Sequence, residues 1–181
     1  MAGGRRDAEG IINDAQLWTL PVESAGGHLK AGTREPFLRS AFREFHPAFS
    51  PDGKWLAYMS NLSAVDEVYG SAFPDNGSQW KISNSGGELP MWSRKTHELL
   101  YQSHDEMLAV SWSEKNGGFV PEKPRVWAAK VGGTAEDLSS DGKQLLVLAP
   151  VNPADAPRAE HEVALFQNFL GYLRQHVPAG K

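Results

Sequence analysis

The chain has 181 residues, of which 40% are hydrophobic and 22% charged, a composition typical of a globular protein and not of a disordered segment. Its formal net charge is −4 and its basic residues are dispersed among acidic ones, which argues against nucleic acid as a partner. Cysteine is absent, which excludes disulfides and thiolate metal sites, and the 18 glycines, 12 prolines and six tryptophans favour an all-β fold with tight turns.

Residues 1–12 contain two arginines but no apolar stretch, so we predict a flexible N-terminal tail followed by one domain over residues 13–181. No window of the sequence is as long and apolar as a membrane span, which predicts a soluble chain without a signal peptide or a membrane partner. As written, such a chain would stay in the cytoplasm.

The first predicted strands are Leu17–Glu23 and Glu35–Ser40, joined by a loop at Gly26 and Gly27. They precede the repeated pattern described next. We therefore interpret them as the two outer strands of a unit whose inner half is missing.

Three copies of one pattern follow, beginning at Pro47, Pro90 and Glu136, which are 43 and 46 residues apart. Each copy has an apolar residue, a serine, a polar turn and an apolar run, as in the first copy, Phe49–Tyr58 (FSPDGKWLAY). The turn residues predict a hairpin, because proline presets φ and glycine can adopt a positive φ. The second copy has Thr96 at the glycine position, so we expect its hairpin to be altered.

Two further strands are predicted after each of the first two copies: Glu67–Phe73 and Gln79–Asn84, then Met107–Ser113 and Arg125–Lys130, with Glu114–Pro124 as a connection. Four strands in a period near 45 residues indicate a β-propeller, because one small sheet buries both faces only between neighbouring sheets. A β-sandwich with coincidental turns is the alternative. The tryptophans inside these strands are expected to pack between sheets and not against a ligand.

The C-terminal residues allow two interpretations. Val151–Glu160 has the composition of a polar connection, and Val163–Phe166 then fits one more strand leading into a short helix. Leu165, Phe169 and Leu173 recur every fourth residue, so a single amphipathic helix from Glu162 is the competing prediction.

The motif at Phe49–Tyr58 resembles the blade motif of TolB-like, WD-repeat-like β-propellers. The run from Leu17 to Val177 is similar to the C-terminal end of propeller sensor domains attached to some bacterial serine/threonine protein kinases. This resemblance implies a bacterial TolB-like propeller and suggests the cell envelope as its compartment. Such relatives have six or seven blades, whereas this chain supplies about three, as two full and two partial ones.

An open arc of blades would expose strand edges and apolar faces, so we expect the chain to associate with itself. Two chains of about three blades would close a six-bladed ring. The predicted partner is therefore a second copy, in a homodimer.

The sequence contains no catalytic motif. A kinase phosphate loop, the G-x-S-x-G elbow of serine hydrolases and the H-E-x-x-H zinc motif are all absent, so no catalytic residue, metal or cofactor is predicted. His46, Glu44, His104 and Asp105 lie near the predicted ends of inner strands, where propellers build ligand sites from loops, and are the candidate ligand-binding residues.

These observations favour a non-enzymatic β-propeller module that binds a protein or a small ligand. The first alternative is a hydrolase, of esterase or lactonase type, with its site at the propeller mouth or between subunits. The second is a truncated propeller remnant without an independent function.

Overall fold

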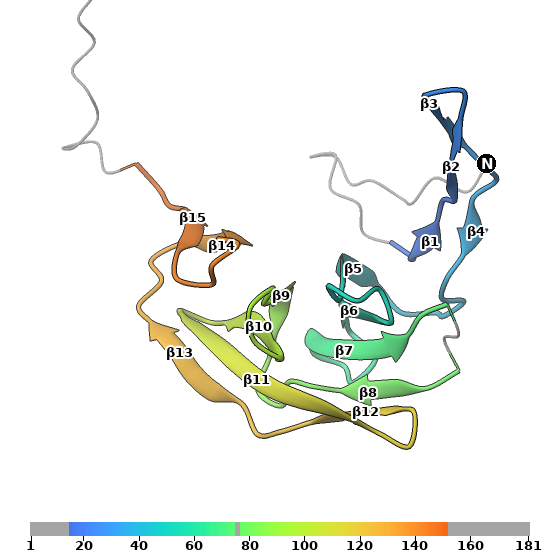
Figure 1. The fold of residues 1–181 in the computed structure, drawn as a ribbon. Helices are drawn as coiled ribbons and strands as arrows, with labels where there is room; N and C mark the ends of the chain where they lie inside the picture. The colour runs from blue at the N-terminus through green and yellow to red at the C-terminus, as the bar shows by residue number, and fades with distance from the viewer. Residues whose placement is uncertain (1–14, 75–76, 152–181) are drawn as a thin grey trace, which may run out of the picture. The chain divides into compact units, whose positions relative to one another are not determined.

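The computed structural model describes residues 15–74 and 77–151, and all regular structure among them is β-strand (Figure 1). The all-β prediction is confirmed for these residues. The predicted tail over residues 1–12 and the predicted strand and helix after Glu162 lie outside the described residues.

The strands of the described residues form five sheets, one of which is the separate hairpin β2–β3 between β1 and β4. We number the other four in chain order: sheet 1 pairs β1 with β4, sheet 2 has the order β5-β6-β7-β8, sheet 3 contains β9 to β13, and sheet 4 pairs β14 with β15. All pairings are antiparallel. The bounds of sheets 1 and 2 are β1 Trp18–Thr19, β2 Val22–Ala25, β3 His28–Ala31, β4 Glu35–Pro36, β5 Glu44–Phe49, β6 Trp55–Ser60, β7 Glu67–Ala72 and β8 Gln79–Lys81. Those of sheets 3 and 4 are β9 Glu88–Trp92, β10 Glu98–Ser103, β11 Glu106–Lys115, β12 Gly118–Pro121, β13 Arg125–Ala129, β14 Thr134–Leu138 and β15 Leu145–Leu148.

The four-stranded units predicted after the first two copies of the repeat are present. Sheet 2 is a simple meander, and every residue of its second strand, β6, is buried. In sheet 3, β9, β10, β11 and β13 form the equivalent set, since β13 pairs with β11.

The prediction of a connection over Glu114–Pro124 is wrong in its middle part, which forms the strand β12. β11 continues to Lys115, turns at Asn116 and Gly117, and pairs with β12. Both turn residues have positive φ, +53° and +74°, as a two-residue hairpin turn requires. The buried ring of Phe119 then anchors β12 in the aromatic cluster between sheets 2 and 3.

The pairing of the first two predicted strands is confirmed, although only Trp18–Thr19 and Glu35–Pro36 pair with each other. Gly26 and Gly27 do not form a loop between those two strands. They form the turn of the additional hairpin β2–β3, with φ of +61° and +82°.

The second hairpin of the repeat is altered, as its threonine predicts. In the first and third copies the glycine has φ of +71° and its N–H donates to the serine carbonyl, as from Gly53 to Ser50 at 2.9 Å. Thr96 does not have a positive φ; its N–H and its hydroxyl group both donate to Ser93 Oγ. The hydroxyl group of Ser93 therefore replaces the backbone acceptor of the turn.

Each pair of successive sheets shares a hydrophobic cluster. The cluster between sheets 2 and 3 contains Trp55 and Trp92 in its core and Trp80 and Trp112 at its edge, and the ring planes of Trp92 and Trp112 meet edge to face at 5.6 Å. Trp127 packs against the cluster between sheets 3 and 4. The prediction that these tryptophans pack between sheets is confirmed.

Hydrogen bonds also join the successive sheets. Trp92 Nε1 donates to the carbonyl of Ala48 at 2.9 Å, which links the first strands of sheets 3 and 2, β9 and β5. On the other side of sheet 3, the Ala135 N–H donates to Gln102 Oε1 at 2.8 Å, which links β14 to the second strand of sheet 3, β10.

Candidate ligand-binding site

The inner strands β5, β9 and β14 begin the three copies of the repeat and have one pairing partner each within the described residues. Each has a register shift near the start of its copy of the repeat. The last paired residues before the shift are Phe45 with Met59, Glu88 with Gln102 and Ala135 with Val147. A β-bulge that recurs in this way is a feature of the repeat, and it re-aims the side chains beside it.

The bulges coincide with unusual backbone conformations. His46 and Leu89, at equivalent positions of β5 and β9, have φ of +52° and +53°. Non-glycine residues seldom adopt a positive φ, because the Cβ atom then crowds the following carbonyl oxygen. The chain holds this conformation twice at the same place, directly before Pro47 and Pro90.

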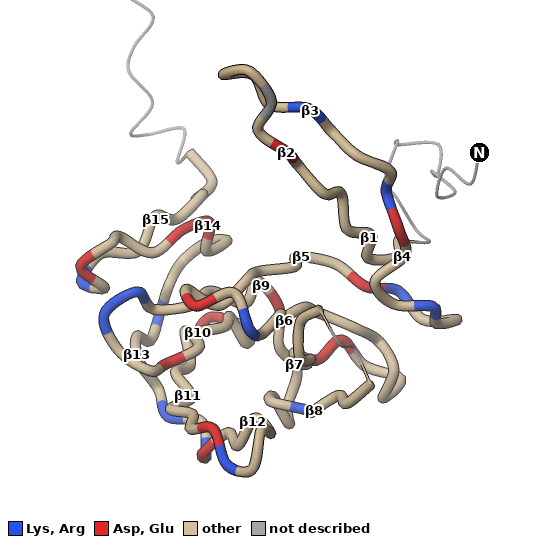
Figure 2. Tube along the Cα trace, turned by 45° about the vertical axis from the view of Figure 1, so that its right-hand side comes forward, with Lys and Arg blue, Asp and Glu red and all other residues tan. Residues whose placement is uncertain are grey.

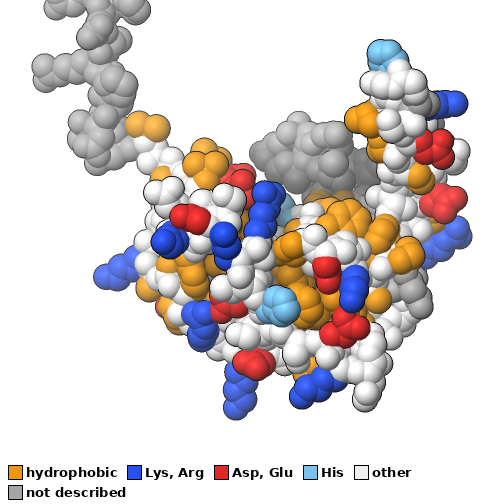
Figure 3. All heavy atoms as spheres, viewed as in Figure 1, with side chains coloured by type: hydrophobic (Ala, Val, Ile, Leu, Met, Phe, Trp, Pro, Cys, Tyr) orange, Lys and Arg blue, Asp and Glu red, His pale blue; other side chains and the backbone are white. Residues whose placement is uncertain are grey.

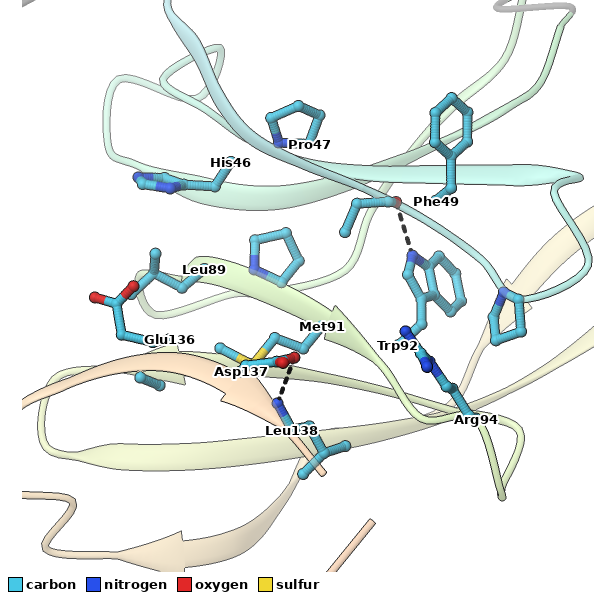
Figure 4. Close-up of a pocket in the computed structure, with 14 residues that line it drawn as sticks. His46, Pro47, Phe49, Leu89, Met91, Trp92, Arg94, Glu136, Asp137 and Leu138 are labelled. Atoms are coloured by element: carbon cyan, nitrogen blue, oxygen red, sulfur yellow. Dashed lines mark hydrogen bonds between the residues drawn. The ribbon is translucent and has the colours of Figure 1, made fainter. Parts of the chain in front are cut away.

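A cavity of 710 Å³ lies along the three inner strands (Figure 4). We call it the inner-strand cavity. Its lining residues come from all three strands and the turns that follow: His46, Pro47, Ala48, Phe49, Pro51, Leu89, Pro90, Met91, Trp92, Arg94, Ala135, Glu136, Asp137 and Leu138. The volume is in the range of small-molecule and peptide sites.

Most side chains that line the cavity are apolar, but polar atoms make up the larger share of the surface that faces it. In the view of Figure 4, His46 and Glu136 lie on one side and Arg94 on the other. Asp137 Oδ1 accepts a hydrogen bond from the Leu138 N–H at 2.8 Å, which orients that carboxylate. Elsewhere on the described chain basic and acidic residues are interspersed, as Figure 2 shows. The cavity therefore offers both signs of charge on a wall of mixed polarity.

Of the four residues predicted as ligand-binding, His46 lines the inner-strand cavity and Glu44 does not. The Glu44 side chain is 3% exposed and lines a second cavity of 330 Å³ beside Tyr58 and Tyr69. Its Oε1 accepts a hydrogen bond from the Ser40 hydroxyl group, whereas its Oε2 is without a partner. Burial raises the pKa of Glu44, and the Ser40 hydrogen bond opposes this shift.

His104 and Asp105 lie together in the turn between β10 and β11, and neither lines the inner-strand cavity. His104 has φ of +56°, and its Nδ1 is 3.2 Å from Ser103 Oγ. Asp105 Oδ1 accepts a hydrogen bond from the Gly132 N–H at 2.7 Å. Both contacts organise neighbouring loops, so these residues have structural partners in the turn.

The sequence analysis missed three charged residues of the cavity: Arg94, Glu136 and Asp137. The signal that could have found them is the repeat itself. Glu136 occupies the position of Pro47 and Pro90, within the register shift, so alignment of the copies would have placed it on the same wall.

Among residues 15–74 and 77–151, no three His, Asp or Glu side chains are close enough together to hold a metal ion. Over the same residues, the structure has no helix that could span a membrane.

No protein-family model matches the sequence, and no curated protein matches it. Among solved structures, the chain is similar to putative TolB from Agrobacterium tumefaciens, with a TM-score of 0.38 and 14% sequence identity. The similar region covers 62% of this chain and 47% of that one, so the chain spans about half the length of that protein. A likeness at this level assigns neither a family nor a function to the chain.

Proposed function

We propose that the chain is a β-propeller module of the TolB-like kind that binds a protein or small-molecule ligand and does not itself catalyse a reaction. Its repeated four-stranded sheets share hydrophobic clusters in chain order, and their first strands lie around one cavity. Counting two four-stranded units and two half units, the chain contributes about three blades. A second copy would complete a six-bladed ring.

The inner-strand cavity is the observation that carries this proposal. Equivalent positions of three sheets supply its wall, which is how a propeller presents one site from many repeats. A site built in this way requires the sheets to remain stacked, and the Trp92 to Ala48 hydrogen bond between two of its walls supports that arrangement.

The lining favours a ligand with a peptide-like character. Inner strands that pair on one side present backbone N–H and C=O groups on the other, which an extended peptide can bond. Pro47, Leu89 and Met91 provide apolar contacts, while Arg94 and Glu136 provide charges for a carboxylate and an ammonium group.

The test is a titration of ¹⁵N-labelled protein with a panel of unmodified tri- and tetrapeptides. Binding is detected as changes in the amide chemical shifts of the protein. Binding at the proposed site would shift residues 45–49, 88–92 and 134–138 together and saturably. Arg94→Ala should raise the dissociation constant about tenfold, the effect of one charge-assisted hydrogen bond. Lys123→Ala, which makes the same change of charge on the exposed connection before β13, is the matched control.

Peptide binding that shifts only residues away from these three strands would contradict the proposal. So would an equal loss of affinity in the two variants, because a general change of charge would then explain the effect.

A further inference from the structure

We propose that sheets 1 and 4 are two halves of one composite sheet, in which β15 of one copy pairs with β1 of a second copy. This inference rests on the proposed function, because it specifies how the ring would close. Within the described residues β15 pairs only with β14, and β1 pairs only with β4. Among residues 15–74 and 77–151, each therefore has one edge without a pairing strand, where sheets 2 and 3 have a further strand.

The two half-sheets correspond to opposite halves of a complete sheet. Sheet 4 is the third copy of the repeat and contains its first and second strands, as β5 and β6 do in sheet 2. Sheet 1 precedes β5 in the chain as β7 and β8 precede β9, so β1 and β4 take the places of the third and fourth strands.

Backbone hydrogen bonds establish this equivalence residue by residue. The N–H groups of Phe37 and Leu38 both donate to the Leu17 carbonyl, at 2.8 and 3.4 Å. In sheet 2, Ile82 and Ser83 donate to the Val68 carbonyl in the same way, at 2.8 and 3.3 Å. Leu17 is therefore the counterpart of Val68.

A second backbone hydrogen bond, donated from the start of the following sheet, also occurs in both places. Glu44 N–H donates to the Ala15 carbonyl at 2.9 Å, and Gly87 N–H donates to the Asp66 carbonyl at 3.0 Å. β1 therefore occupies in sheet 1 the place that β7 occupies in sheet 2. A residue that precedes each of these strands accepts the same hydrogen bond from the start of the next sheet.

The register of the composite sheet follows from this equivalence. In complete sheets, the second strand pairs with the third as Met59 with Val68 in sheet 2 and Gln102 with Met107 in sheet 3. Leu148 occupies that position of β15 and Leu17 that of β1. The predicted pairs between copies are Leu148 with Leu17, Val147 with Trp18, Leu146 with Thr19 and Leu145 with Leu20.

Exposed apolar side chains lie at both of the edges to be joined. On sheet 4, Leu146 and Leu148 are 64% and 67% exposed. On the other side, Trp18, Leu20 and Phe49 are about half exposed. Figure 3 shows hydrophobic side chains on the surface in both regions. Exposed apolar patches beside unpaired strand edges mark sites of association.

A cavity provides the space that the incoming strand would occupy. It has a volume of 380 Å³, and its wall is almost entirely apolar, with Leu17, Thr19, Phe49, Leu56 and Phe73 among its lining residues. Its lining residues come from sheets 1 and 2 and from the residues beside their strands.

The residues at the positions of sheets 2 and 3 that correspond to Leu146 also indicate that β15 fills this cavity. Ala57 and Leu100, the counterparts of Leu146, are buried in the clusters that sheets 2 and 3 form with the sheets that follow them. In the composite sheet, Leu146 would enter the 380 Å³ cavity and contact Leu56 and Phe49 of the second copy.

Cysteine cross-linking tests the register directly, because the chain has no cysteine of its own. In Thr19→Cys/Leu146→Cys, two residues expected to lie opposite each other should form a disulfide between copies under mild oxidation. Gels without reductant should then show a covalent dimer as the main product. The control, Thr19→Cys/Val126→Cys, pairs the same site with a similarly exposed residue of β13 and should remain largely uncross-linked.

A second variant tests the apolar contact without a disulfide. Leu146→Asp replaces a side chain that is exposed in the single chain, so the fold should be retained, which circular dichroism can check. The dissociation constant of the dimer should rise by about tenfold or more, because a buried leucine is replaced by a charge.

The outcomes separate this inference from the proposed function. A dimer in solution that forms no Thr19→Cys/Leu146→Cys cross-link would overturn the composite sheet and leave self-association in place. A disulfide within one chain would also overturn it. A monomer at all concentrations would overturn both the composite sheet and ring closure, and peptide binding at the inner-strand cavity would still be measured separately.

Discussion

Removing the hydroxyl group of Ser83 should destabilise the protein far more than the loss of one oxygen atom suggests. This side chain is completely buried, and its Oγ accepts a hydrogen bond from the Val68 N–H at 2.7 Å. The hydroxyl group of Ser83 donates to Glu67 Oε2, while Glu67 Oε1 pairs with Lys81 Nζ at 3.0 Å. Ser83→Ala would leave a buried N–H and a buried carboxylate oxygen without this partner. Buried polar groups cost about 1–3 kcal/mol each when they lose a partner, so we expect a loss of about 3 kcal/mol.

Urea unfolding of the two proteins, followed by tryptophan fluorescence, measures this difference. Ser78→Ala, a change of the same size at an exposed residue just before β8, should stay within about 0.5 kcal/mol of the wild-type protein. If Ser83→Ala unfolded at the same urea concentration as the wild-type protein, the buried network would not contribute to stability as argued.

Four other variants test the fold and its buried groups. Trp92→Phe removes the hydrogen bond to the Ala48 carbonyl and part of the aromatic cluster, and urea unfolding should show a loss of about 2 kcal/mol; an unchanged midpoint would argue against the contact between sheets 2 and 3. Gly53→Ala forces a side chain into φ of +71° and should cost about 1 kcal/mol, whereas Thr96→Ala at the equivalent turn should cost less, and the reverse order would contradict the altered hairpin. Because burial raises the pKa of Glu44, its contribution to stability is present below the ordinary pKa of glutamate and is lost as the pH rises through the raised value. Glu44→Gln should therefore gain unfolding free energy relative to the wild-type protein as the pH rises above the ordinary pKa of glutamate, and a pH-independent difference would refute this.

The repeat predicted most of the fold because its turn residues have strict backbone requirements. The positive φ that Gly53 and Gly142 adopt can be anticipated from sequence, and so can its absence at Thr96. The extra hairpin of sheet 3 escaped prediction because its short strand, Gly118–Pro121, ends in one proline and is closely followed by another, Pro124. Its turn at Asn116 and Gly117 was the available signal.

The candidate site was harder to predict, because it depends on a bulge. Residues 44 and 46 are two apart and would share one face of a regular strand. The register shift between Phe45 and Ala48 breaks this alternation, so His46 lines the inner-strand cavity while Glu44 is buried elsewhere. Arg94 and Asp137 reach the cavity only through the stacking of sheets, which no local pattern specifies.

The mass of the protein in solution tests the central claim most directly. Light scattering after size-exclusion chromatography should give a discrete species near twice the chain mass of 19.8 kDa, and Leu146→Asp should shift it toward the monomer. A wild-type protein that elutes as a stable 19.8 kDa monomer at every concentration would contradict the account, because its exposed edges would then need no second copy.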